Sequence, residues 1–86
     1  SKPKPKQTKI VDETASLLFD DVVKQKFSYH FFTQTLKLER DEIGLFLNFV
    51  DTPEVRERHL LLPANQFELI EYLIQKSAVF LSNKEK

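Results

Sequence analysis

Hydrophobic and polar residues alternate through the middle of the chain, and this alternation predicts β-strands. Aromatic, Thr and Val residues, and Leu at every second position, occupy short segments separated by polar breaks. This spacing is typical of a strand with one buried face. Because such segments follow one another, the pattern predicts a four-stranded antiparallel sheet. The segments are Val22–Phe27, Phe32–Glu39, Leu45–Val50 and His59–Leu62.

A helical pattern follows the last of these segments. Asn65 comes two residues after Pro63 and is a candidate N-cap, and Glu68 stands three residues further on, as in a capping box. Apolar residues then recur three and four positions apart, so one face of this helix should be buried against the sheet. The predicted fold class is therefore α+β. The predicted buried face consists of Phe67, Ile70, Leu73, Ile74, Ala78 and Leu81.

The N-terminal segment differs from the rest in charge. The chain is neutral overall, but residues 1–9 carry +4 and residues 10–81 carry −5. Prolines between the lysines favour an extended arm, which is either a solubilising tail or a segment that contacts phosphates. Helical spacing over Asp12–Val23 predicts a short helix that ends at Asp20–Asp21 before the first strand.

Length and composition indicate one domain. The predicted organisation is a basic arm over residues 1–10, a single domain over 11–83 and a disordered tail over 84–86. A domain of 86 residues buries only about 60% of its unfolded surface, so dimerisation would help to stabilise it. We expect a homodimer in which the C-terminal helix contacts the partner, because additional apolar residues widen its apolar face. These are Leu69, Tyr72, Leu73 and Phe80.

Candidate catalytic residues are few. His30 and His59 lack metal-ligand spacing, and the chain has no cysteine. Asp41 and Glu42 are neighbours and would point to opposite sides of an extended chain. The single glycine, Gly44, excludes a Gly-rich phosphate loop and is expected in a tight turn between strands. We therefore expect no enzyme activity, no metal and no cofactor.

The absence of cysteine, of a signal-peptide pattern and of an apolar run near the roughly 20 residues of a membrane span favours a soluble, intracellular protein. No interaction with a membrane is expected.

The central motifs resemble a known family. The stretch Thr35–Val50, followed by Arg58–Pro63 and the terminal helix, is similar to one repeat of the PUR-alpha family of purine-rich-element binding proteins. Gly44 falls on the glycine of that repeat, Phe46 on its aromatic residue and Asn48 near its lysine. The transcriptional-coactivator and plant Whirly families share the same general organisation.

This resemblance implies a curved antiparallel sheet with one long helix packed on one face, pairing of two repeats, and binding of single-stranded DNA or RNA on the open face. Alternation places Leu36, Leu38, Leu45, Leu47 and Phe49 beneath the helix. Phe46 would stack on a base, or would fill the dimer interface instead. The expected nucleic-acid-binding residues are Lys24, Lys26, Lys37, Arg40, Phe46 and Asn48.

One departure from the family pattern supports a different function. Glu39 and Asp41 stand where family repeats carry residues that suit a phosphate, and carboxylates repel phosphate. The alternative to a nucleic-acid-binding protein is therefore a protein-interaction or assembly module that keeps the fold and binds a protein partner.

Overall fold

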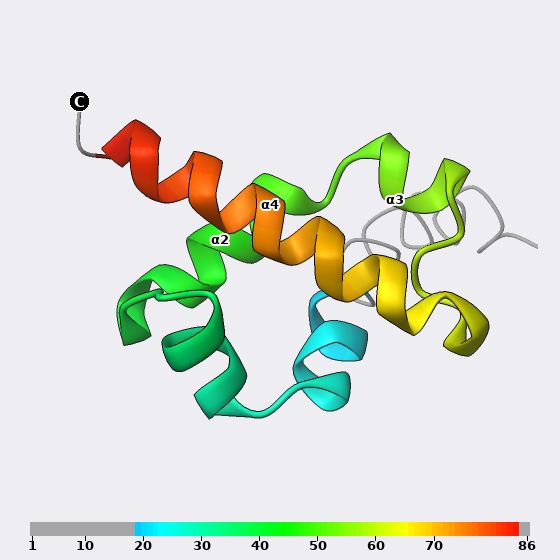
Figure 1. The fold of residues 1–86 in the computed structure, drawn as a ribbon, viewed down its shortest axis with the longest axis horizontal. Coiled ribbons are helices and arrows are strands. Elements are labelled where there is room, and N and C mark those ends of the chain that lie inside the picture. Colours follow the sequence, from blue (N-terminus) through cyan, green and yellow to red (C-terminus); the bar gives the residue numbers. More distant parts are fainter. Residues whose placement is uncertain (1–18, 85–86) are drawn as a thin grey trace, which may run out of the picture.

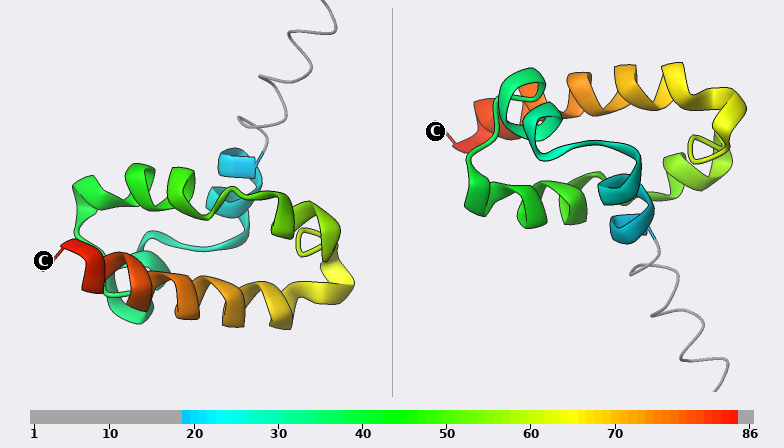
Figure 2. Two further views of the ribbon diagram at one scale, coloured as in Figure 1. Left: turned by 90° about the horizontal axis from the view of Figure 1, so that it is seen from above. Right: turned by 90° about the horizontal axis from the view of Figure 1, so that it is seen from below.

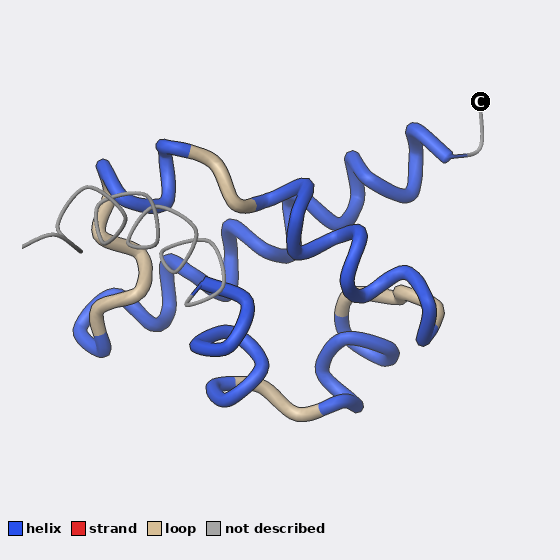
Figure 3. Tube along the Cα trace, turned by 180° about the vertical axis from the view of Figure 1, so that it is seen from behind, coloured by secondary structure: helices blue, strands red, loops and turns tan. Residues whose placement is uncertain are grey.

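The computed structural model describes residues 19–84, and within this range the chain forms helices joined by turns, with no β-strand (Figures 1 and 3). The predicted α+β class and its four-stranded sheet are therefore wrong. The predicted basic arm and most of the predicted helix Asp12–Val23 lie outside the described residues. A helix is described over residues 19–26, and the later elements are η1 (Phe31–Thr35), η2 (Arg40–Glu42), α2 (Ile43–Val50), α3 (Pro53–Glu57), η3 (Pro63–Asn65) and α4 (Gln66–Lys84).

Helix α2 replaces the third predicted strand. Its sequence satisfies the period of two, but the buried positions follow the helical period instead. Leu45, expected beneath the C-terminal helix, is 65% exposed, and Phe49 is 37% exposed although its ring lies 5.6 Å from that of Phe80 in α4. Gly44, expected in a tight turn, lies inside the helix without a positive φ. The positions turned to the core, spaced three and four residues apart, are Ile43, Phe46, Leu47 and Val50.

The first predicted strand is also helical. Phe19, Val23 and Phe27 lie four residues apart, and all three pack in or against the core. The helix continues through residue 26 and does not end at Asp20–Asp21.

The second predicted strand contains a wide helical turn. The Ser28 hydroxyl accepts a hydrogen bond from the Phe31 N–H at 3.2 Å, which caps the helical segment that follows. The Leu36 N–H then donates to the Phe31 carbonyl, five residues earlier, at 3.0 Å, the pattern of a π-helix. Lys37 ends this segment in the left-handed region, with φ 65°.

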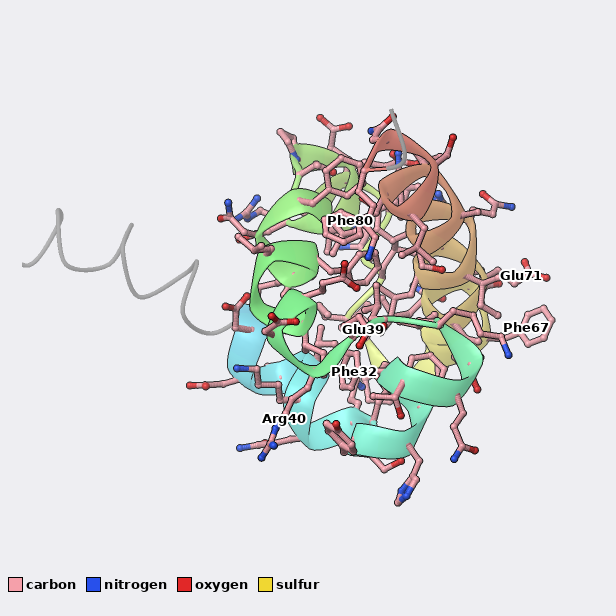
Figure 4. All side chains as sticks on the ribbon, turned by 90° about the vertical axis from the view of Figure 1, so that its left-hand side faces the viewer. Phe32, Glu39, Arg40, Phe67, Glu71 and Phe80 are labelled. Carbon is pink, nitrogen blue, oxygen red and sulfur yellow. The ribbon has the colours of Figure 1, made fainter. Side chains whose placement is uncertain are left out.

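Helices α2 and α4 run antiparallel along opposite sides of the molecule (Figure 2). At one end, the Lys84 ammonium forms an ion pair with the Glu42 carboxylate. In the middle, the Phe46 and Phe80 rings meet edge to face, with centroids 5.5 Å apart. Phe80 lies between the two ribbons in Figure 4. These contacts fix the register of one helix against the other.

Tyr72 ties α4 to the C-terminal end of α2. Its hydroxyl donates to the Val50 carbonyl at 3.0 Å, which satisfies one of the carbonyls that a helix end leaves free. Because the single hydroxyl proton is used there, the Thr52 hydroxyl, also 3.0 Å away, must donate to Tyr72.

The connection from α2 to α4 is built around two prolines. Pro53 occupies the first turn of α3, where its missing N–H costs nothing, and Pro63 does the same in η3. The predicted strand His59–Leu62 is a turn instead, with His59 in the left-handed region at φ 54°. The Asn65 amide, expected as a helix cap, donates to the His59 carbonyl at 2.8 Å and holds this turn closed.

The long C-terminal helix predicted from the sequence is present as α4, but its buried face differs from the predicted one. Phe67 and Ile74, expected to be buried, are 67% and 42% exposed. The predicted dimer contact through Leu69, Tyr72, Leu73 and Phe80 is wrong in detail, because these side chains pack inside the same chain. Dimerisation itself stays a prediction. The fully buried positions of α4 are Leu69, Tyr72, Leu73 and Ser77.

Every described element longer than three residues contributes to one hydrophobic core. The core consists of Phe19, Val23, Phe32, Leu36, Leu38, Phe46, Leu47, Val50, Val55, Leu60, Leu69, Tyr72 and Leu73.

Among residues 19–84, no helix is both long enough and apolar enough to cross a membrane.

Candidate protein-docking site

The predicted base-stacking residue has no free ring face. Phe46 is 0% exposed and packs against Phe80 in the core. Stacking on a base requires an accessible aromatic face. The expectation that Phe46 lies on an open surface is therefore wrong, because the helical period of α2 turns it inward.

The remaining predicted nucleic-acid residues are distributed over different elements, and the sheet that was to present them together is absent. Lys24 is exposed on the helix 19–26, whereas Lys26 donates to the Gln66 side chain of α4 at 3.3 Å. The other three, all exposed, lie in a turn, in η2 and on α2. They are Lys37, Arg40 and Asn48.

One of these residues lines an apolar pocket. The pocket, of about 250 Å³, lies among three parts of the chain: the helix 19–26, the aromatic segment that follows it, and the first turn of α2. Its lining residues are Lys24, Phe27, Tyr29, Phe32 and Ile43, and we call it the aromatic pocket.

Stacked rings support the wall of the aromatic pocket. The Phe27 and Phe31 rings lie 4.3 Å apart at 18°, and Phe32 meets Phe31 edge to face at 5.7 Å. Such ring pairs add about 0.5–1.5 kcal/mol beyond area burial, so the wall is held in a defined shape. Tyr29, at the edge of the pocket, is 51% exposed. Four aromatic residues between positions 27 and 32 were the sequence signal for this cluster.

Charge near the aromatic pocket is mixed. Burial raises the pKa of the Asp20 carboxyl, and the Lys24 ammonium acts in the opposite direction, whereas Asp51 and Asp21 raise the pKa further. Lys24 therefore has a carboxylate one helical turn away. This rim is not a concentrated positive surface of the kind that attracts a phosphate backbone.

A second pocket, of about 270 Å³, lies at the turn between α3 and α4. Its cation, Arg56, is engaged by the Asp51 carboxylate at 3.5 Å. Both pockets are smaller than the roughly 300–1,000 Å³ of typical small-molecule sites. Within the described residues, no three His, Asp or Glu side chains are grouped as metal ligands. The lining residues are Val55, Arg56, His59, Leu61 and Leu62.

Pockets that fit one anchoring side chain, next to exposed aromatic residues on a small helical domain, are typical of protein-interaction domains. Comparison with known families agrees with this class. The chain belongs to the BamP C-terminal domain family, whose model matches residues 16–84. No curated protein and no solved structure matches the chain.

The family assignment corrects several expectations. The resemblance to the PUR-alpha family was wrong, and with it the prediction of DNA or RNA binding. The BamP family is associated with the assembly machinery of the bacterial outer membrane, which overturns the expectation of an intracellular protein. A protein-interaction or assembly role, the alternative drawn from the acidic turn, is the function that the family supports.

Proposed function

We propose that this domain is a non-catalytic docking module through which its protein associates with the BAM complex, the assembly machinery of the bacterial outer membrane. The aromatic pocket is the docking site. The family assignment supports the choice of partner, and the geometry of the aromatic pocket supports the choice of docking surface.

The main support for this proposal is that Tyr29, which lines the apolar pocket, is half-exposed. Tyr29 is 51% exposed, although four other aromatic and apolar groups nearby are in or against the core. Tyrosine is enriched among the few residues that dominate binding energy in protein interfaces, and such residues pair with pockets. A partner side chain that entered the pocket would cover the Tyr29 ring, and the Tyr29 hydroxyl could form a hydrogen bond with the partner.

Lys24 would give this site a preference for a partner that carries a carboxylate. Lys24 lines the pocket and is exposed, so a partner segment with an apolar anchor next to a carboxylate would match both the apolar lining and this cation. The nearby Asp20 limits this contribution, so most of the affinity should come from the anchor.

The proposal is tested by co-isolation of the full-length protein with BAM subunits from detergent-solubilised membranes. Tyr29→Asp places a charge at the pocket and should remove most of the co-isolated BAM subunits. Leu45→Asp is the matched control, because Leu45 is 65% exposed and lies about 200° around α2 from Ile43, the pocket residue of that helix. It should co-isolate as the wild type does.

The possible outcomes separate the partner from the site. Wild-type protein that brings down no BAM subunit would contradict the proposed function. Equal recovery with both Asp variants would retain the function and reject the aromatic pocket.

A further inference from the structure

Helix α4 carries a second apolar stripe on the side turned away from the core. Phe67 and Ile74 are 67% and 42% exposed, and Ala78 is exposed as well. Ile70 and Leu81 border them and are half-buried, and Leu81 also packs against the core. In Figure 4, Phe67 and its neighbour Glu71 project outward from α4, whereas Phe80 points inward. We call these five apolar residues the outer stripe.

The outer stripe makes α4 apolar on two sides, since Leu69, Leu73 and Phe80 already face the core. Glu68, Glu71 and Gln75 form a polar sector between these two sides, and an apolar stripe left exposed beside such a sector is typical of an interaction surface. The described part of the chain covers only one of these sides. We therefore expect a further binding partner to cover the other side.

We propose that the outer stripe is an interface with a second copy of this chain, in which two α4 helices pack antiparallel about a two-fold axis at Ile74. This inference does not depend on the proposed function, because it rests on a different face and needs no BAM subunit.

The spacing of the outer stripe identifies a second copy as the occupant. From Phe67 to Leu81 the successive spacings are three, four, four and three residues, a sequence that is the same in both directions from Ile74. A two-fold interface requires such self-complementarity, because each residue meets its counterpart in the reversed helix. Ile74 would meet Ile74 of the partner subunit.

The two remaining pairs are also apolar. Phe67 would meet Leu81 of the partner subunit, which brings two large side chains together near the ends of the stripe. Ile70 would meet Ala78 of the partner subunit, which places a large side chain opposite a small one. Ridges on each helix then fit grooves on the other, which is how helices approach to the usual 8–10 Å between axes.

The polar border of the outer stripe is compatible with this pairing. Glu71 and Gln75 lie on the same side of the stripe and are both exposed. In the antiparallel arrangement Glu71 lies alongside Gln75 of the partner subunit, whose amide can donate to the carboxylate. The two Glu71 carboxylates are separated by roughly six residues along the axis, about 9 Å, so they do not oppose each other closely.

The size of the outer stripe predicts weak association. Stable interfaces use about 20–30 residues a side, and this one uses five apolar residues with their polar border. We therefore expect a monomer–dimer equilibrium that depends on concentration, and not an obligate dimer.

Two matched variants test the interface by sedimentation equilibrium over a range of concentrations. Ile74→Glu should give a monomer at all concentrations, with unchanged helix content by circular dichroism because Ile74 is outside the core. Val79→Glu is the control: Val79 is 47% exposed but lies about 140° around α4 from Ile74, off the outer stripe. It should self-associate as the wild type does.

Cysteine cross-linking tests the symmetry, and the chain contains no cysteine that would interfere. Ile74→Cys should form a disulfide-linked dimer on mild oxidation because the axis passes through that position, whereas Val79→Cys should not. A mixture of Phe67→Cys and Leu81→Cys chains should cross-link to each other, and neither should cross-link to itself.

Three results would overturn the proposal. One is a monomeric mass for the wild type at all concentrations together with no cross-link at position 74. Another is self-linking of Phe67→Cys, which would mean a parallel pair. The third is a monomer in which Ile74→Glu lowers recovery of BAM subunits, which would assign the outer stripe to another protein.

Discussion

Phe46 and Phe67 have identical side chains in opposite environments. Phe46 is fully buried between α2 and α4, and Phe67 is two-thirds exposed at the start of α4. Phe46→Ala should lower the free energy of unfolding by about 3–5 kcal/mol, because it leaves a cavity in the core. Phe67→Ala should change it by no more than about 0.5 kcal/mol in the monomer. Urea unfolding of both variants checks this, and a well-folded Phe46→Ala protein of wild-type stability would contradict the assignment of Phe46 to the core.

A substitution at Gly44 tests whether this position lies in a helix or in a tight turn. It lies inside α2 without a positive φ, and a Cβ added there would meet no atom within 4 Å. Gly44→Ala should therefore raise the free energy of unfolding by about 0.5–1 kcal/mol, because alanine loses less backbone entropy in a helix. In a tight turn with positive φ the same substitution would destabilise the protein. The sign of the change in urea midpoint decides between the two.

Tyr72 contributes to the stability of the fold through its hydroxyl group. Tyr72→Phe keeps the buried ring but removes the hydroxyl that donates to the Val50 carbonyl and accepts from the Thr52 hydroxyl, while the Val50 carbonyl keeps its bond from the Thr52 N–H. We expect a loss of about 0.5–1.5 kcal/mol for each hydrogen bond removed. Tyr29→Phe is the control, since Tyr29 is half-exposed and its hydroxyl can bond to water; it should change stability by no more than about 0.5 kcal/mol. Equal effects of the two substitutions in urea unfolding would show that the Val50 bond does not hold the helices together.

At the scale of elements, the ion pair between Glu42 and Lys84 joins the start of α2 to the end of α4. The Lys84 ammonium lowers the pKa of Glu42 below its ordinary value of 4.5, and the Glu39 N–H, which donates at 2.7 Å, acts in the same direction. A carboxyl whose pKa is lower in the folded state stabilises the fold above its unfolded pKa. That contribution is lost as the pH falls through the folded pKa.

Glu42→Gln removes the charge and retains an oxygen that can accept the Glu39 N–H. Above pH 4.5 the wild type should be more stable than this variant, and the difference should shrink as the pH falls below 4.5. Urea unfolding of both proteins from neutral to acidic pH measures the difference. A difference that stays constant with pH would mean that the ion pair does not contribute to stability. Because the Lys84 side chain is 47% exposed, high salt should also reduce the difference.

Helix α4 was predictable from the sequence, and α2 was not. The helical pattern of α4 extends over 19 residues, and Pro63 lies in the short turn before the helix begins. The eight residues of α2 fit both the alternating and the helical period, because Leu47 belongs to both apolar sets. Only packing against α4 decides between them. Thr52 followed by Pro53 was a usable signal for the start of α3, since proline favours the first helical turn.

At the scale of the whole molecule, the sequence indicated a candidate site only in part. Lys24 was predicted as a binding residue, and it does line the aromatic pocket, although the predicted ligand was wrong. Phe27 and Phe32 were assigned to two separate strands, with Tyr29 and Phe31 in the break between them, so these rings were not expected to gather at one place. Which face of a helix is left uncovered depends on the packing of every other element. The outer stripe of α4 was therefore expected in the core.

A photoreactive group placed in the aromatic pocket should reach the docked protein in living cells, so site-specific photo-cross-linking tests whether this pocket docks a protein. A photoreactive phenylalanine at position 29 keeps the size and ring of Tyr29, and the same group at position 45 serves as the exposed control. Position 29 should form a covalent product with a BAM subunit, and position 45 should not. A cross-link to no protein from position 29, or equal products from both positions, would contradict it.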